Sequence, residues 1–511
     1  MTSLKKQAVS GVKWLAINQI FQRVIRVISF AILARMLEPS VFGLFAMAFI
    51  AIDGFSFMKS FGVDGALIQR PVDETFEDAK HTAFFMLQGT AFVIFLIFEL
   101  AAPLLAGLLK NQEVLTILRA LGAIFLINNL GRLPNALLTK KMRFNVLSII
   151  ELAACILNAV CAVIFAAMWK NVWSLVAAYL IKMVFTASAT WFFEPYRIRF
   201  VFKWKIAKEL FHFGKFMTGM GILGFITYNM DQILISRMLG ATMLGFFVLA
   251  QNITAFTQQN LLAHVGRVLF PAFAAAQRDP EQVKRGFLNT ARYISILDIP
   301  FTLGIMAVAK EFTLAMYGPK YEIVGSLIQI IAFGQLIGPI VSGTEAVYMA
   351  SGKINWSYRL QLLRFFIRIT FLIILSHFWG IYGVAAVPFC NACIMVPVQY
   401  FLVRRLVKFT FKEFIRRMYP AFPATLIMVA SVYAVKWALF RYPQLIFFDF
   451  HHVMPLLYFA VVGGPVYFAS LWLMDRALVK DMLGMLLPRF FEKSAAPQKK
   501  TPVMPAVLPE P

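Results

Sequence analysis

The first long apolar segment of the chain, residues 9–37, reads VSGVKWLAINQIFQRVIRVISFAILARML and is long enough to cross a bilayer with some tilt. Arg23 and Arg26 lie near its middle, where neither side chain easily reaches the lipid headgroups. An arginine at this depth costs about 2.5–3.5 kcal/mol on insertion scales, and it therefore normally faces a cavity or a partner. At 100° per residue, one arc of about 140° contains the central polar positions Asn18, Gln19, Gln22, Arg23, Arg26 and Ser29. This pattern predicts a helix with one cationic, amide-rich side that suits an anionic ligand.

The composition is that of a membrane protein. Hydrophobic residues make up 60% of the 511 residues and charged residues only 14%, whereas soluble domains carry about 25% charged residues. A single soluble core could not bury this much apolar surface, so we predict a polytopic membrane protein. We expect no cleavable signal peptide, because the first apolar segment is too long, contains two arginines and is followed by no small-residue cleavage site.

Apolar segments recur along the whole chain, roughly every 35 residues. They predict an all-α fold of about 14 transmembrane helices at residues 9–37, 41–64, 81–107, 114–138, 145–168, 171–193, 209–238, 241–265, 287–309, 322–347, 356–377, 381–403, 418–440 and 453–474. The loops on one side are short, for example at 38–40, 240–242 and 377–380, and no soluble domain is inserted.

The net charge of +24 is distributed by loop. Alternate loops are rich in lysine and arginine, such as 140–143, 197–208 and 404–417, whereas the opposite loops contain only Lys110, Lys170, Lys310, Lys320 and Arg441. The positive-inside rule then places the basic loops and both termini in the cytoplasm. Because topology explains the excess of positive charge, we expect no nucleic-acid partner.

The chain contains an internal repeat. Residues 32–48 align without gaps with residues 234–250, an offset of 202 that matches Arg35 with Arg237 and Gly43 with Gly245. Both copies span the outer turn between an odd and an even predicted helix. An even number of helices separates them, so the two halves have the same orientation and are related by an axis along the membrane normal. Transporters built in this way bind their substrate at the interface between the repeats.

Several motifs resemble a known family. These are Gly11-Val-Lys-Trp14, Ile32-Leu-Ala-Arg35 with Phe42-Gly43, Gly65-Ala-Leu-Ile-Gln-Arg70, and Asn229-Met-Asp-Gln-Ile-Leu-Ile-Ser-Arg237. They are similar to the bacterial polysaccharide or O-antigen flippases, the Wzx-type exporters of the multidrug/oligosaccharidyl-lipid/polysaccharide superfamily, whose other members include the MATE transporters. The resemblance covers most of the chain and is strongest over residues 9–280.

The resemblance implies both a fold and a function. The fold has two six-helix lobes around a central cavity, at residues 1–200 and 201–410, then two further helices at 411–480. The proline-rich end of the chain separately predicts a largely disordered cytoplasmic tail at 481–511. The function is to move an undecaprenyl-pyrophosphate-linked oligosaccharide across the bacterial inner membrane for exopolysaccharide, capsule or O-antigen assembly, by rocking of the lobes. Membrane lipids, a polysaccharide polymerase and a chain-length regulator are expected partners. No cofactor or nucleotide site is implied, and the sequence lacks GxxxxGK[ST].

The predicted substrate-binding residues begin with Arg23 and Arg26. A pyrophosphate-linked lipid has an anionic head, and arginine offers a permanent charge and a donor fork that matches phosphate. Gln22 and Asn18 lie on the same side of the helix. A structural ion pair is the alternative, because Asp53 lies about as far after the 38–40 turn as Arg26 lies before it. Such a pair could also couple transport to protons or sodium, so Asp53 is an ion-coupling candidate.

Further candidates lie in later segments. In the eleventh, the spacing of polar residues places Arg364 and Arg368 on one face, where they either line the cavity or pair with acids such as Glu345. Lys182 lies mid-span in the sixth and is a weaker substrate-binding candidate. In the seventh, Asp231 could hold a cation, and a structural role that neutralises Arg237 is the alternative.

We predict a transporter and not an enzyme, because the chain has no zinc-ligand cluster, nucleophile elbow or large extramembrane domain. Cys390 and Cys393 have metal-ligand spacing, but no histidine or second cysteine pair accompanies them, so we expect helix packing and no bound metal. An ion-coupled multidrug antiporter is the nearest alternative function. A membrane polysaccharide polymerase is a more distant one, since it needs a long outer loop or a catalytic domain.

Overall fold

The structure, a computed structural model, describes residues 2–56, 63–257, 273, 279–336, 338, 343–441, 456, 458–476 and 478–479. Helices form all the regular structure of these residues. Their bounds are α1 Thr2–Met36, α2 Pro39–Ser56, α3 Val63–Gln69, α4 Phe76–Leu108, α5 Glu113–Lys140, α6 Phe144–Trp169, α7 Trp173–Phe193, α8 Trp204–Thr257, α10 Pro280–Met316, the 3₁₀ helix η2 Pro319–Tyr321, α11 Glu322–Gln335, α12 Thr344–Ala350, α13 Ile354–Val407, α14 Phe411–Met418, α15 Ala421–Arg441, the π-helix η5 Phe459–Gly463 and α17 Gly464–Met474.

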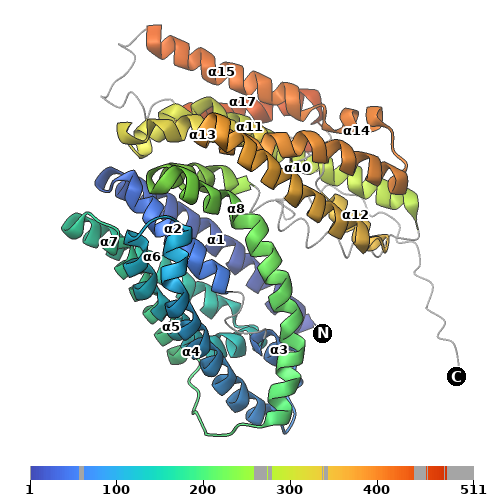
Figure 1. Cartoon of the computed structure of the whole chain (residues 1–511). Helices are drawn as coiled ribbons and strands as arrows, with labels where there is room; N and C mark the ends of the chain where they lie inside the picture. The colour runs from blue at the N-terminus through green and yellow to red at the C-terminus, as the bar shows by residue number, and fades with distance from the viewer. Residues whose placement is uncertain are drawn as a thin grey trace, which may run out of the picture.

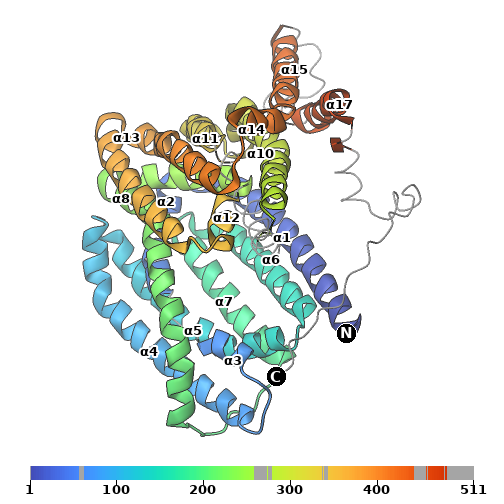
Figure 2. The same cartoon turned by 90° about the vertical axis from the view of Figure 1, so that its right-hand side faces the viewer.

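The helices form two groups, with α1–α7 in one, α10–α17 in the other and α8 between them (Figure 1). The first group is built from the pairs α1 with α6, α4 with α5, and α7 with both α5 and α6. In the second, α10 packs against α11 and α15, and α11 packs against α13. The two groups remain distinct in the perpendicular view (Figure 2). The lobe boundaries near residues 200, 410 and 480 stay predictions, and the tail at 481–511 lies outside the described residues.

Nine helices among the described residues are long and apolar enough to span a membrane. Two of them are each interrupted by one glycine with non-helical angles, α8 at Gly240 with φ 82° and α13 at Gly380 with φ 55°. Positive φ favours glycine, so each helix turns there and continues as a second helix. Both glycines lie in predicted outer loops. The predicted segment at 322–347 is not one helix, because α11 ends at Gln335 and α12 begins at Thr344. The full count of fourteen stays a prediction.

The closest contact between helices α2 and α8 is made at two glycines. A Cβ atom added to Gly43 would lie 1.7 Å from the carbonyl oxygen of Ala241, and one added to Gly245 would lie 2.0 Å from the carbonyl oxygen of Pro39. At the offset of 202, Pro39 corresponds to Ala241 and Gly43 corresponds to Gly245. The glycine of each copy therefore lies against the carbonyl group of the other copy. This reciprocity is the property of a two-fold axis. The repeat in the sequence is therefore also a spatial repeat at this contact.

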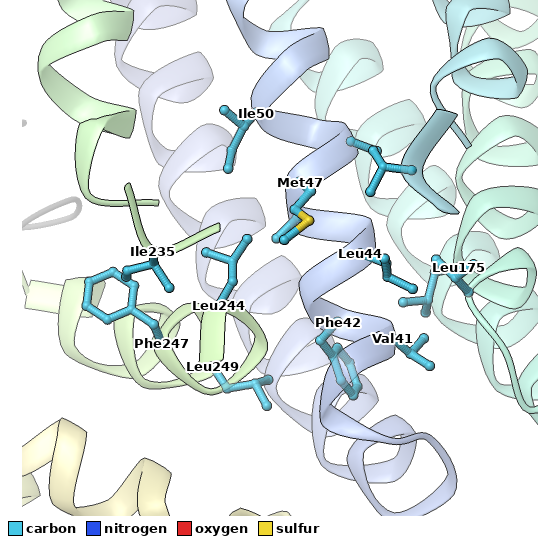
Figure 3. Packing of buried hydrophobic residues seen from close by; sticks show 14 of the residues in the cluster. Val41, Phe42, Leu44, Met47, Ile50, Leu175, Ile235, Leu244, Phe247 and Leu249 are labelled. Atoms are coloured by element: carbon cyan, nitrogen blue, oxygen red, sulfur yellow. The ribbon is translucent and has the colours of Figure 1, made fainter. Parts of the chain in front are cut away.

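Apolar side chains surround the glycine contact. Figure 3 shows Phe42 and Met47 on α2 near Leu244 and Phe247 on α8, and all four are buried. They belong to one core cluster that continues into α4, α5, α7 and α11. Small residues that let backbones approach closely are typical of helix contacts in membranes, where burial of apolar surface gives little driving force.

The end of α1 and the turn that follows it are joined to the end of α10 and to η2 by three polar contacts. The hydroxyl of Tyr321 donates a 2.9 Å hydrogen bond to the carbonyl oxygen of Leu37, and Arg35 donates to the carbonyl oxygen of Ala315. An ion pair of 2.5 Å links Lys320 Nζ with Glu38. Burial, with a smaller effect of Glu38, raises the pKa of Tyr321, so its hydroxyl stays protonated and remains a donor. These contacts tie the two groups together at the predicted outer end.

Candidate functional site

The polar side chains of helix α1 point in two directions, some toward α6 and others toward a pocket beside α8 and the end of α10. Asn18 Nδ2 and Gln22 Nε2 point toward α6, where they donate hydrogen bonds of 3.3 and 3.4 Å to Oε2 of Glu151. Arg23 and Arg26 line a small pocket of about 80 Å³ whose other wall comes from Asn252, Ile253 and Tyr317. The predicted polar side of α1 is therefore divided. The amides face the interior of the first group of helices, and the arginines face α8 and the end of α10.

The interior of the first group contains a polar cavity of about 520 Å³ between α1, α3, α5, α6 and α7. Gln22, Glu151 and Lys182 are among the residues that line it. Asp64 and Arg132 form an ion pair of 2.6 Å in its wall. The cavity brings Gln22 and Lys182 together, as two of the predicted substrate-binding residues. Glu151 is the residue whose role the sequence did not reveal, because a single carboxylate in an apolar helix gives no sign of its partners.

Arg26 connects the two spaces electrostatically. It lines the small pocket, and Lys182 lies within range of the charges of both Arg26 and Glu151. The Lys182 Nζ atom also lies 5.5 Å from the ring centroid of Tyr179. Asp53, which is exposed at the end of α2, lies within electrostatic range of the same tyrosine. Tyr179 is therefore near both Lys182 and Asp53, whereas the direct pairing of Asp53 with Arg26 stays a prediction.

The predicted charged residues of the second group form ion pairs. Arg368 Nε donates a 3.0 Å hydrogen bond to Asp231 Oδ1, and Arg368 Nη2 donates to Oδ2 of the same carboxylate. The partner of Asp231 is thus Arg368 and not Arg237. Positions 231 and 237 differ by about 240° around a helix, so their side chains leave on different sides. Arg368, predicted to bind substrate, and Asp231, predicted to couple transport to an ion, are therefore partners in one ion pair, and both roles stay predictions.

Arg364 lies toward a different acid. Its Nη1 atom is 3.9 Å from Oε1 of Glu345 on α12, the acid named as its alternative partner. Glu345 is exposed, and a long, exposed ion pair contributes little to stability. Among the described residues, no group of three or more His, Cys, Asp or Glu side chains is arranged to hold a metal ion.

The protein is thus a bundle of helices, nine of them able to span a membrane among the described residues, with a repeated hairpin contact between α2 and α8. The structure is similar to that of the lipid II flippase MurJ in an inward closed conformation, with a TM-score of 0.72 over 91% of this chain and 99% of that one, at 14% identity. It is also similar to an inward-facing multidrug resistance MATE family transporter of the MOP superfamily, with a TM-score of 0.60, 16% identity and coverage of 78% and 98%. At these identities the likeness shows the fold.

The sequence identifies the family within that fold. Residues 32–326 match the polysaccharide biosynthesis protein family, and the chain belongs to it. The lipopolysaccharide biosynthesis protein WzxC of Escherichia coli (strain K12) is 24% identical over 436 residues, which are 85% of this chain and 88% of that protein. The teichuronic acid biosynthesis protein TuaB of Bacillus subtilis (strain 168) is 28% identical over 364 residues, 70% and 74% of the two chains. The succinoglycan biosynthesis transport protein ExoT of Rhizobium meliloti (strain 1021) is 26% identical over 331 residues, 65% and 66%.

Proposed function

We propose that this protein translocates an undecaprenyl-pyrophosphate-linked oligosaccharide across the inner membrane for exopolysaccharide, capsule or O-antigen assembly. The observation that carries the proposal is the position of Arg23 and Arg26 on α1, the predicted first transmembrane helix, where they line a pocket with residues of α8 and the end of α10. Membership of the polysaccharide biosynthesis family, with relatives named for polysaccharide assembly and transport, supports the substrate class.

The arginines would hold the pyrophosphate while the lipid crosses the membrane. A guanidinium is always charged and binds two phosphate oxygens with parallel hydrogen bonds, so it replaces part of the hydration that the anion loses in a region of low dielectric constant. Lys182, Gln22 and Asn18 would extend the site toward the sugar, in the cavity beside α6. Hydrogen bonds to charged groups contribute about 1.5–3 kcal/mol each, so the loss of one arginine should slow transport by one to two orders of magnitude.

Transport would proceed by alternating access. The pocket beside Arg23 and Arg26 measures about 80 Å³, whereas pockets for drug-sized ligands measure about 300–1,000 Å³. The two groups of helices must therefore separate before a lipid-linked sugar can enter. We infer that they rock about the glycine contact between α2 and α8, around a site that stays near the membrane midplane. Asp53 and the Asp231–Arg368 pair would couple this movement to an ion.

The orientation and the partners belong to the same proposal. The basic loops place both termini in the cytoplasm, so the substrate would be taken up from the inner leaflet. A polysaccharide polymerase and a chain-length regulator would receive the translocated unit. The chain would move its substrate without making or breaking a covalent bond.

A flipping assay tests the proposal. Purified protein is reconstituted in vesicles with a fluorescent undecaprenyl-pyrophosphate oligosaccharide, and the fraction that becomes accessible to an added quencher is followed with time. Arg23→Gln and Arg26→Gln should each reduce the rate at least about tenfold. Arg119→Gln, at an exposed position on α5, is the matched control and should keep the wild-type rate.

Two outcomes would overturn the proposal. One is a wild-type rate in both arginine variants, with insertion and melting temperature unchanged. The other is an intact wild-type protein that does not flip the lipid but exports cationic drugs against a proton or sodium gradient, which would indicate the multidrug antiporter.

A further inference from the structure

A second charged cavity lies far along the chain from the α1 arginines. It has a volume of about 530 Å³ and lies between the first turns of α10, helix α14 and the residue that follows α17. Its wall contains five basic and three acidic side chains, namely Lys284, Arg285, Arg292, Arg416 and Arg417 with Glu281, Glu413 and Asp475. The cavity therefore has an excess of two positive charges, and it shares no residue with the sites described above.

Two of the three acids are already held by bases. Glu413 Oε1 lies 3.2 Å from Lys284 Nζ, and Asp475 accepts a hydrogen bond from Arg292. Arg417 donates a 3.1 Å hydrogen bond to the amide oxygen of Asn289, which is neutral and leaves the charge of Arg417 uncompensated. The remaining guanidinium groups, those of Arg285, Arg416 and Arg417, share the cavity with Glu281. Like charges gathered in one cavity repel each other, and a bound anion relieves that repulsion.

Helix α14 fixes this arrangement. Its first turn is closed by a capping box, in which Glu413 N donates to the Thr410 hydroxyl at 3.3 Å and Thr410 N donates to the Glu413 carboxylate at 2.9 Å. Phe414 is buried beside Phe287 of α10, with ring centroids 6.3 Å apart. The basic side chains of α14 are therefore presented by a helix that is anchored at its start and along its buried face.

A row of apolar side chains continues beside the basic ones on α14. Phe411, Ile415 and Tyr419 follow at intervals of four residues, so they lie on one face, and they are 60%, 42% and 64% exposed. A short helix with one exposed apolar face next to a basic face is typical of a helix that lies in the membrane interface. The apolar row then reaches the boundary of the acyl chains, and the arginines lie at the level of the headgroups.

We propose that this cavity binds the phosphate headgroup of an anionic phospholipid in the leaflet next to the basic loop 404–417, the predicted cytoplasmic leaflet. The phosphate lies among Arg285, Arg416 and Arg417, and the acyl chains lie along Phe411, Ile415 and Tyr419. Basic pockets between membrane helices bind such headgroups, and guanidinium forks match phosphate oxygens. Free phosphate offers the same oxygens but no chains for the apolar row, so the structure favours the lipid. The bound lipid would hold α10 against α14. This site is independent of the proposed translocation.

Lipid binding to the purified full chain tests the proposal. Native mass spectrometry measures binding of phosphatidylglycerol, phosphatidylcholine and inorganic phosphate to the wild type, to Arg285→Gln/Arg416→Gln and to Arg416→Gln. The matched control is Arg197→Gln/Arg199→Gln, which removes two exposed charges from another basic loop. We expect phosphatidylglycerol to bind the wild type at least about tenfold more tightly than phosphatidylcholine, the double variant to lose that preference, and the single variant to lose part of it.

The controls separate the possible explanations. Retention of the preference by Arg197→Gln/Arg199→Gln supports a site, whereas an equal loss there would show attraction by net charge alone and overturn the proposal. Unchanged phosphatidylglycerol binding in the double variant would also overturn it. Inorganic phosphate that competes at the lipid's own concentration would identify an anion site without a role for the acyl chains, against the proposal. The melting temperatures in phosphatidylcholine should agree among all the proteins, because the substituted side chains are exposed.

Discussion

Arg368 on α13 donates two hydrogen bonds to the carboxylate of Asp231 on α8, one from Nε at 3.0 Å and one from Nη2. The carboxylate side chain of Asp231 is only 3% exposed, so its charge depends on this single arginine for most of its compensation. Both residues lie within membrane-spanning helices. The pair therefore joins the central helix α8 to the second group of helices.

Replacing one residue of this ion pair should lower the stability of the protein more, per residue replaced, than replacing both residues together. Arg368→Gln leaves the buried charge of Asp231 without its partner, and we expect a loss of about 3–5 kcal/mol in the free energy of unfolding. Asp231→Asn leaves the charge of Arg368, which is partly exposed, and should lose less. The double variant Asp231→Asn/Arg368→Gln removes both charges and should lose less than the sum of the single losses. Denaturant unfolding in detergent, followed by tryptophan fluorescence, measures all three values. Additive losses would show that the two side chains do not stabilise one another.

Substitution at the glycine contact should separate the two groups of helices. Gly43→Ala and Gly245→Ala each place a methyl group within 2.0 Å of a carbonyl oxygen, so the helices must move apart, at a loss of about 1–3 kcal/mol. Gly89→Ala is the matched control, since its Cβ would meet no atom within 4 Å, and it should be neutral or stabilising. Thermal unfolding in detergent measures the difference. Equal melting temperatures for Gly43→Ala and the control would contradict the close approach.

Of the contacts between η2 and the turn after α1, the hydrogen bond of Tyr321 should stabilise the protein more than the ion pair of Lys320. Tyr321→Phe leaves the buried carbonyl oxygen of Leu37 without its donor, and we expect a loss of about 1 kcal/mol or more. Lys320→Ala removes an ion pair whose two side chains are both more than half exposed, so its loss should stay below about 1 kcal/mol. Melting temperatures of the two variants give the comparison. A larger effect at Lys320 would mean that the ion pair carries the contact.

Lys140 should stabilise the end of α3. Its Nζ atom donates to the carbonyl oxygens of Ile68, at 2.9 Å, and of Arg70, which belong to the last turn of α3 and the residue after it. Lys140→Met removes this cap and should speed hydrogen exchange in residues 63–69 by about tenfold or more. Lys205→Met, at an exposed position, should leave that exchange unchanged. Unaltered exchange in Lys140→Met would show that the cap is dispensable.

Hydropathy predicted most of the helices among the described residues, because it depends on residues that are close in sequence. The turns at Gly240 and Gly380 lie where the short loops were predicted, and the two copies of the repeat meet at the contact between α2 and α8, which the sequence did not predict. The break between α11 and α12 was missed, because the apolar run at 322–347 continues through it.

Side-chain partners were harder to predict. Asp231 and Arg368 are 137 residues apart, and Gln22 and Glu151 are 129 residues apart. Whether such side chains meet depends on the rotation of each helix about its own axis, which packing sets and hydropathy does not encode. Arg23 and Arg26 were singled out by their position in the middle of an apolar segment, but only the structure shows that Gln22 and the two arginines line different cavities.

The reciprocal contact of Gly43 with Ala241 and of Gly245 with Pro39 has a consequence for the origin of the chain. A shorter protein with a single copy of this hairpin would carry a self-complementary surface, because each copy supplies both the glycine and the carbonyl that receives it. Two such molecules could associate through it as a symmetric homodimer. In the present chain both copies keep the glycine, whereas the residue whose carbonyl oxygen lies against it is Pro39 in one copy and Ala241 in the other.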